Sequence, residues 1–350
     1  MTRKLQLLTG LLALVLPTVM RAAPAQLRTG ASTAVDGYLE ILPDEYGSWA
    51  QPFATGGFGP NADRYKPVGL SLQPVGFSSG LFLFAPNGQR ELLSDNTDWQ
   101  TMVPAPPGFS ADTSLDRMIL SPNVASDSNG DGINDTANSA FRVSGGATDL
   151  NFALQQRVAS ASGAVSFMQQ TYTVTNNGAA SLALNLVRAF DGDLLWSGTA
   201  ANDQVGTTAN GAGLGQFVVI RETSNNSTAI TLSGGTQGHF YYGGKQNFTP
   251  PNGPPAYGFG TDVQVWDAFG IPGSWQNNIA TIGYNTDGFS GAVTGTQDAF
   301  IGLDFLFNLA AGASVTFDVF HTYGQATPVP EPATLGLLVL AGMAVLRRRG

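Results

Sequence analysis

"AVSFMQQTYTVTNNGAASLALNLVRAF", residues 164 to 190, contains two segments in which apolar and polar residues alternate. Alternation with a period of two places the apolar side chains on one face of a β-strand, as in a sheet with one buried side. Between the two segments stands "NNGAAS", whose Asn and Gly residues favour a turn. We expect residues 164–175 and 182–190 to form an antiparallel hairpin.

Strand signals recur along the rest of the chain. The run "LFLF" (81–84), the turn "APNG" and the run "QREL" indicate a second hairpin, because Asn-Gly supplies the positive φ of a tight turn. "QFVVIRET" and "TAITL" flank "SNN" in a third. In "SVTFDVFHTYG" (314–324) the residues expected on one face are Val315, Phe317, Val319 and His321.

The sequence therefore predicts an all-β fold, an antiparallel β-sandwich. Between the two terminal segments we find no amphipathic helix, and many strands with turns between them are typical of sandwiches. Residues 26–327 form either one large sandwich or two packed ones that divide near residue 145. Residues 104–140 and 243–260 are expected to be loops.

The composition limits the partners of the chain. Between Gln26 and Pro330 lie 10 basic and 24 acidic residues, and this acidic balance excludes nucleic acid as a partner. Cysteine is absent, 43% of the residues are hydrophobic and only 12% are charged. These values indicate a folded domain with an apolar core and a surface dominated by uncharged polar residues.

The N-terminus has the features of an export signal. Two basic residues precede an apolar run from Leu5 to Val19, and "APA" at residues 23–25 matches the pattern of a signal-peptidase site. We expect residues 1–25 to be a signal peptide that is removed before Gln26. The alternative is a short N-terminal anchor that is retained.

The C-terminus is "PVPEPATLGLLVLAGMAVLRRRG", residues 328–350. Its apolar part, residues 333–346, has 14 residues. As a helix this part is about 21 Å long, shorter than a bilayer core of about 30 Å. Arginines concentrate on the cytoplasmic side of a membrane. We therefore expect a short transmembrane helix at 333–346, with residues 26–330 outside the cytoplasm.

This tail resembles the PEP-CTERM sorting signal of exported proteins in Gram-negative bacteria. The resemblance implies an exosortase as the processing partner, a membrane tether until the tail is removed, and a final location at the cell surface or in the extracellular matrix. It also implies an association with exopolysaccharide. The residues of the motif and of the arginine cluster are Pro330, Glu331, Pro332, Arg347, Arg348 and Arg349.

A calcium site is expected in "SDSNGDGINDTAN", residues 126–138. Ca²⁺ takes hard oxygen ligands from alternate positions, with glycine where the chain turns sharply. The loop resembles the calcium repeats of thrombospondin type 3 and dockerin modules, but Asn138 stands where an EF-hand has glutamate. The alternative is a turn that binds nothing. The predicted ligands are the side chains of Asp127, Asn129, Asp131 and Asp135 and the carbonyl oxygen of Ile133.

Other polar residues allow more than one interpretation. Asp191 and Asp193 share a face if their strand continues through them. They are then either the acid–base pair of a glycosidase, a second cation site, or two solvated acids at a strand end. His239 and His321 are the only histidines, too few for a multi-histidine zinc site. We expect His321 in the core with its nitrogens hydrogen-bonded.

Nine aromatic residues lie between Phe240 and Trp275. Aromatic faces stack on sugar rings, although aromatic residues in β-rich chains mostly fill the core. The candidate glycan contacts, which lie in Pro- and Gly-rich stretches, are Tyr257, Phe259 and Trp275.

Together these features predict a non-enzymatic, exported protein of the cell surface or extracellular matrix, associated with exopolysaccharide and braced by a structural Ca²⁺. Two alternatives from other classes stay open. One is a secreted polysaccharide hydrolase or lyase that uses Asp191 and Asp193, and the other is a protein-binding adhesin.

Overall fold

The computed structural model describes residues 25–49, 63–75, 78–86, 89–94, 115–162, 165–192, 194, 196, 203–207, 217–222, 225–233, 239–244 and 299–324. In these residues every regular element is a β-strand and every strand pair is antiparallel, which confirms the predicted all-β class. Residues 1–24 of the predicted signal peptide and the predicted helix at 333–346 lie outside them. No helix within the described part is long and apolar enough to cross a membrane.

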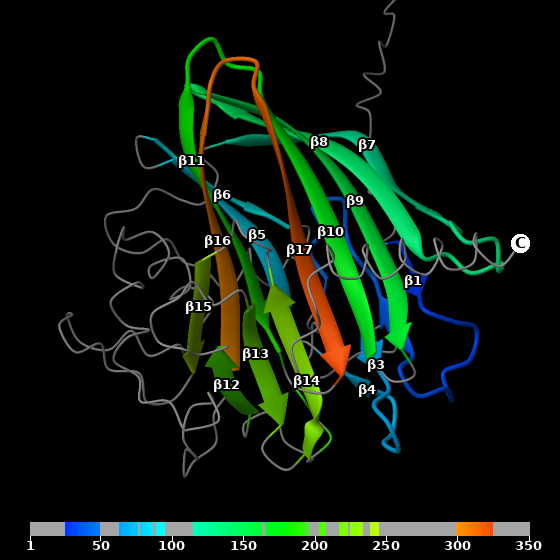
Figure 1. The fold of residues 1–350 in the computed structure, drawn as a ribbon. Coiled ribbons are helices and arrows are strands. Elements are labelled where there is room, and N and C mark those ends of the chain that lie inside the picture. The colour runs from blue at the N-terminus through cyan, green and yellow to red at the C-terminus, as the bar shows by residue number, and fades with distance from the viewer. Residues whose placement is uncertain are drawn as a thin grey trace, which may run out of the picture.

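The strands form three sheets, which we name by size. The large sheet crosses Figure 1 from lower left to upper right. In spatial order its strands are β12 (Asp203–Thr207), β13 (Phe217–Glu222), β14 (Asn225–Ser233), β17 (Ser314–Gly324), β10 (Val165–Asn176), β9 (Thr148–Ser162), β8 (Thr136–Gly145) and β7 (Asp116–Ser126). The middle sheet consists of β15 (His239–Gly244), β16 (Ala299–Leu309), β11 (Leu182–Asp191), β5 (Ser78–Ala85) and β6 (Gln89–Leu93). The small sheet consists of β1 (Leu27–Arg28), β2 (Leu39–Ile41), β3 (Arg64–Tyr65) and β4 (Gln73–Pro74).

One apolar core lies between the large and middle sheets, as in a sandwich. Along β10 the side chains alternate strictly between buried and half-buried, as the period of two predicts. Across the core, the ring of Phe305 on β16 lies 4.5 Å from that of Phe317 on β17. The small sheet contributes to the same core through Leu27, Leu39, Ile41 and Tyr65.

The predicted hairpin of residues 164–190 is wrong, although both of its strands form. β10 pairs with β9 and β17, whereas β11 pairs with β5 and β16, so the connection crosses from the large sheet to the middle sheet. Asn176 holds the crossing, because its side-chain amide donates to the carbonyl oxygens of Ala180 and Leu309, each at 2.9 Å. Two strands that face each other across a core show the same alternation as a hairpin, which explains the error.

The other hairpins are confirmed by the antiparallel pairs β5–β6 and β13–β14. On β17, Phe317, Val319 and His321 are buried as predicted. The predicted loop at 104–140 is wrong in part, because it contains β7 and the start of β8. β7 is an edge strand with two register shifts, where a proline such as Pro122 is tolerated and alternation is lost. Residues 245–260 of the second predicted loop lie outside the described residues.

Residues 43–48, between β2 and β3, lie along the inner face of the large sheet. Their carbonyl oxygens accept hydrogen bonds from strand side chains: that of Tyr46 from Tyr172 Oη at 3.0 Å, and that of Gly47 from Gln170 Nε2 at 2.6 Å. Gly47 has a φ of 86°, and a Cβ there would lie 2.3 Å from Tyr172 Oη. The segment explains why polar residues occupy inward positions of β10.

Candidate functional site

The loop predicted to bind calcium connects β7 to β8 and is organised by its own side chains. The Asp127 carboxylate accepts the backbone N–H groups of Gly130 and Gly132, each at 2.7 Å. Asn129 and Asp131 each accept the N–H group two residues further on. These amides, that of Gly132 first, hold the pKa of Asp127 below its usual range, so the carboxylate is charged at neutral pH.

Asp135 has a different environment from the other predicted ligands. It is buried, and its carboxylate accepts hydrogen bonds from Ser128 N at 2.8 Å, Ser128 Oγ at 2.9 Å and Thr136 Oγ1 at 3.0 Å. Asp135 thus closes the base of the loop. Among the described residues, no three His, Cys, Asp or Glu side chains are grouped to hold a metal ion. Calcium binding by the amide, carbonyl and carboxylate oxygens of the predicted set stays a prediction.

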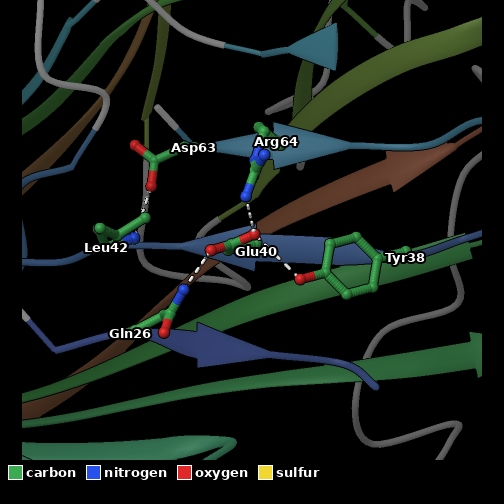
Figure 2. A network of polar contacts seen from close by, with 6 residues as sticks. All are labelled: Gln26, Tyr38, Glu40, Leu42, Asp63 and Arg64. Atoms are coloured by element: carbon green, nitrogen blue, oxygen red, sulfur yellow. Dashed lines mark hydrogen bonds and ion pairs between the residues drawn. The ribbon is translucent and has the colours of Figure 1, made fainter. Parts of the chain in front are cut away.

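A second polar group lies in the small sheet and is shown in Figure 2. This Glu40 network consists of Glu40, Gln26, Tyr38 and Arg64. Glu40 is only 3% exposed, yet both of its carboxylate oxygens have partners. Oε1 accepts the side-chain amide of Gln26, and Oε2 accepts Tyr38 Oη at 3.0 Å and Arg64 Nη2 at 2.6 Å. Burial first, and then the Glu40 charge, raises the pKa of Tyr38 to about 12, so the phenol donates at neutral pH.

The Glu40 network has the arrangement of a structural brace. Its four residues come from β1, β2 and β3 or their ends, so the contacts tie the three strands together. Beside it, Asp63 Oδ1 accepts the backbone N–H of Leu42 at 2.5 Å. When a buried carboxylate has a hydrogen-bond donor on each oxygen and a cation on one of them, these contacts offset the cost of removing its charge from water.

A third group of polar side chains lies in the core between the large and middle sheets. We call it the Arg188 cluster: Arg188, Trp49, His321 and Tyr323, all fully buried. Arg188 Nη2 donates to Ser79 Oγ at 2.8 Å, and Arg188 Cζ lies 6.0 Å from the centroid of the Trp49 ring. The Trp49 ring centroid lies 4.8 Å from that of His321 and 6.3 Å from that of Tyr323.

Most polar atoms of the Arg188 cluster lack a hydrogen-bond partner in the described part of the chain. These atoms are Arg188 Nε and Nη1, Trp49 Nε1, both ring nitrogens of His321 and Tyr323 Oη. Burial first, and then the Arg188 charge, holds the pKa of His321 well below its usual range, so the ring is neutral. Burial first, and then Asp63, raises the pKa of Tyr323 well above its usual range. The cluster therefore carries one positive charge and an excess of donors.

The other predicted site residues have varied outcomes. His321 is in the core as predicted, but the expectation that its nitrogens are hydrogen-bonded is wrong within the described residues. β11 ends at Asp191, and the pairing of this residue with Asp193 stays a prediction because Asp193 lies outside the described residues. Also outside them are Tyr257, Phe259, Trp275, Pro330, Glu331, Pro332, Arg347, Arg348 and Arg349.

Sequence reasoning missed Arg188, although the sequence carried a signal for it. In "LALNLVRAF" the inward positions are Leu182, Leu184, Leu186, Arg188 and Phe190. A charged residue at an inward position of a strand is rarely buried unless it is paired, so it marks a candidate site. Trp49, from a different part of the chain, had no such signal.

Comparison with solved structures finds distant similarity to sugar-processing enzymes and related proteins. A protein from the human microbiome assigned as a kojibiose phosphorylase has 8% identity and a TM-score of 0.35, over 93% of this chain and 37% of that one. A galactose mutarotase-like protein from Lactobacillus casei has 9% identity and a TM-score of 0.35, over 85% of this chain and 100% of that one. The heparan sulfate lyase HepC from Pedobacter heparinus has 9% identity and a TM-score of 0.33, over 89% and 36%. The chain thus spans little more than a third of the phosphorylase and the lyase, and TM-scores this low carry no functional argument.

We also compared the sequence with curated proteins and with protein-family models. No curated protein matches the chain. Residues 328–349 match the PEP-CTERM protein-sorting motif, which confirms the resemblance seen in the tail. The chain therefore ends in a PEP-CTERM sorting signal, which implies export and processing by an exosortase.

Proposed function

We propose that the protein is a non-enzymatic component of the cell surface or extracellular matrix that associates with exopolysaccharide. The observation that carries this proposal is the sorting motif at residues 328–349. An exosortase would recognise the motif while the apolar segment 333–346 tethers the chain in the membrane. The folded part of the chain would then reach the surface.

The outer face of the large sheet supports an association with a polysaccharide. Exposed hydroxyl groups pair across β10 and β17: Thr173 Oγ1 with Thr316 Oγ1 at 2.9 Å, and Thr175 Oγ1 with Ser314 Oγ at 2.7 Å. Such rows contribute to sheet stability and leave a surface of donors and acceptors, in which the one carboxylate of the row, Asp318, accepts from Thr171 Oγ1 at 2.5 Å. A polysaccharide presents mostly hydroxyl groups, so this surface suits it better than a densely charged one would.

Binding and cleavage are tested together. The full-length chain is incubated with the exopolysaccharide of the producing organism, with calcium or with a chelator, and co-sedimentation and new reducing ends are measured. We expect co-sedimentation without new reducing ends. New reducing ends would overturn the non-enzymatic role, and the absence of co-sedimentation would overturn the association.

The sorting step is tested in the producing cells. Replacing Pro330, Glu331 and Pro332 by alanine should leave the chain in the membrane fraction, because the processing enzyme loses its recognition motif. Thr327→Ala, just before the motif, is the control and should be released normally. Release of both variants to the same extent would contradict the proposal.

We also propose that Ca²⁺ braces the loop between β7 and β8. At about 1 mM Ca²⁺ a site with the Kd of extracellular modules, about 10⁻⁴ to 10⁻³ M, would stabilise the folded state by about 0.4–1.4 kcal/mol and raise Tm. Asp131→Ala should abolish the rise, because it removes an exposed oxygen ligand. Asp149→Ala, on β9, should keep it. Identical melting curves of the wild type with calcium and with a chelator would sink the idea.

A further inference from the structure

The Arg188 cluster contains a charge that its neighbours in the protein do not neutralise by contact. In the described part of the chain Arg188 makes no ion pair, and its one hydrogen bond goes to the neutral Ser79 hydroxyl. Burial lowers the pKa of Arg188, the charge of Asp44 raises it through space, and the Asp44 carboxylate accepts the backbone N–H groups of Tyr46 and Ser48. A buried charge without a contacting partner is unfavourable, so its presence requires an explanation.

The atoms of the Arg188 cluster that lack a hydrogen-bond partner indicate which chemical groups a ligand would need. The guanidinium of Arg188 and the indole N–H of Trp49 can only donate hydrogen bonds, and the neutral phenol of Tyr323 can also donate. A positive, donor-rich group suits an anionic acceptor. The planar fork of arginine matches a carboxylate in particular, because two parallel N–H groups meet its two oxygens.

The other side chains of the cluster can bind hydroxyl groups of the same ligand. A neutral His321 offers one donor and one acceptor, and the Tyr323 hydroxyl can do the same. The indole of Trp49, whose ring centroid also lies 4.7 Å from that of Phe190, is the aromatic group of the cluster, and aromatic rings are the side chains on which sugar rings stack. A molecule that combines a carboxylate, hydroxyl groups and a ring with apolar faces is an acidic sugar.

The cluster lies close to one end of the sandwich. β11 ends at Asp191 and β17 at Gly324, only a few residues beyond Arg188 and Tyr323. Aromatic rings lead outward from it. The Tyr65 ring lies 5.6 Å from that of Tyr323, and the partly exposed Trp196 ring lies 6.2 Å from that of Tyr65.

We propose that the Arg188 cluster binds the carboxylate of an acidic sugar, with the carboxylate on Arg188 and the sugar hydroxyls on Tyr323 and His321. This inference rests on the proposed function only for the source of the sugar, an acidic residue of the exopolysaccharide. A free sugar acid has the same chemistry, and the test separates the two sources.

The test measures Tm and tryptophan fluorescence of the full-length chain with D-glucuronate as the probe. D-Glucose lacks the carboxylate and acetate lacks the sugar. We expect glucuronate to raise Tm in a concentration-dependent way, with smaller effects of the other two. Arg188→Gln should weaken the response at least tenfold, since about 1.4 kcal/mol of lost binding corresponds to tenfold in Kd.

A pair of tyrosine variants guards against a misfolded arginine variant. Tyr323→Phe removes an unpartnered hydroxyl of the cluster, whereas Tyr172→Phe, on the neighbouring strand, removes one that donates to the Tyr46 carbonyl. Only Tyr323→Phe should weaken the response to glucuronate. No response of the wild type, or equal responses of the two variants, would overturn the proposal.

The sugar arms complete the test. A glucose response equal to that of glucuronate would overturn the role of the carboxylate, and an acetate response equal to that of glucuronate would overturn the role of the sugar. If glucuronate binds but the exopolysaccharide does not co-sediment, the proposed function fails and this inference stands for a free sugar acid.

Discussion

The Glu40 network and the Arg188 cluster are two buried polar groups that differ in how many of their polar atoms have hydrogen-bond partners. In the first, a carboxylate that is 3% exposed has a donor on each oxygen, including an arginine at 2.6 Å. In the second, a fully buried arginine has one hydrogen bond within the described part of the chain, to a hydroxyl. The Glu40 carboxylate thus has a partner on each oxygen, although Arg64 Nε beside it has none in the described residues, whereas the Arg188 cluster leaves most of its polar atoms without a partner.

This difference separates structural from functional polar groups. A satisfied network makes its contribution when the chain folds, so removing one member should cost stability. An unsatisfied cluster opposes folding, so removing a member should cost little or even stabilise the protein. Stability variants of the two regions therefore give opposite results if the distinction is correct.

The largest expected loss comes from the segment that joins the two regions, residues 43–49. Gly47→Ala combines a positive φ with a Cβ 2.3 Å from Tyr172 Oη, so we expect a loss of about 4 kcal/mol. Urea denaturation measures it. Gly69→Ala is the control, because Gly69 has a φ of 68° and its added Cβ would meet no atom within 4 Å. Equal losses for both variants would show that the contact with Tyr172 does not matter.

The next effect compares the central residues of the two regions directly. Glu40→Leu should cost about 3 kcal/mol, because it leaves Arg64 without its carboxylate and Tyr38 without its acceptor. Arg188→Met should cost less than about 1 kcal/mol or stabilise the protein, because it removes a buried charge that lacks an ion pair in the described residues. Denaturant midpoints of the two variants give the answer. A larger loss for Arg188→Met than for Glu40→Leu would break the comparison.

A smaller contrast is expected between the buried tyrosines of neighbouring strands. Without any ligand, Tyr172→Phe should cost about 1 kcal/mol, because it leaves the Tyr46 carbonyl without this donor. Tyr323→Phe should leave the free energy of unfolding unchanged or raise it. Both variants keep the aromatic ring, so packing is matched. If the two variants lose the same free energy of unfolding within error, the lack of a partner for the Tyr323 hydroxyl does not affect stability.

The smallest effect concerns alkaline pH. The pKa of Tyr38 is raised to about 12 in the folded state, above the value of 10.0 expected for an unfolded chain. The unfolded state therefore loses its proton first, and stability should fall as pH rises from about 10 to about 12. Tyr38→Phe should reduce the slope of stability against pH by about one proton in this window. An unchanged slope would mean that Glu40 and burial do not hold the proton on Tyr38.

Much of the fold could be predicted from the sequence, because strands show themselves locally. The alternation in residues 164–175 and 182–190 located β10 and β11 correctly. Their partners could not be predicted from the same pattern, because a strand facing another across a core has the same periodicity as one paired beside it. β7 was missed because edge strands need no alternation where both faces are partly exposed.

The candidate sites divide in the same way. The Asp-rich loop and the sorting motif are continuous in sequence, and their residues could be named from spacing alone. The Arg188 cluster is assembled from Trp49, β11 and β17, which are far apart along the chain. Only the inward position of Arg188 gave a local sign, and its neighbours depend on which strands face each other.

The crossing of β10 to β11 also bears on the speed and timing of folding. Thr175 meets Ser314 across a sequence separation of 139 residues, and Thr173 meets Thr316 across 143. Contacts this distant along the chain slow folding, because the ends of long loops must meet before any contact is gained. The central strands of both sheets are complete only when β16 and β17 are present. A chain that is exported N-terminus first would therefore complete the large and middle sheets only after β16 and β17 have crossed the membrane.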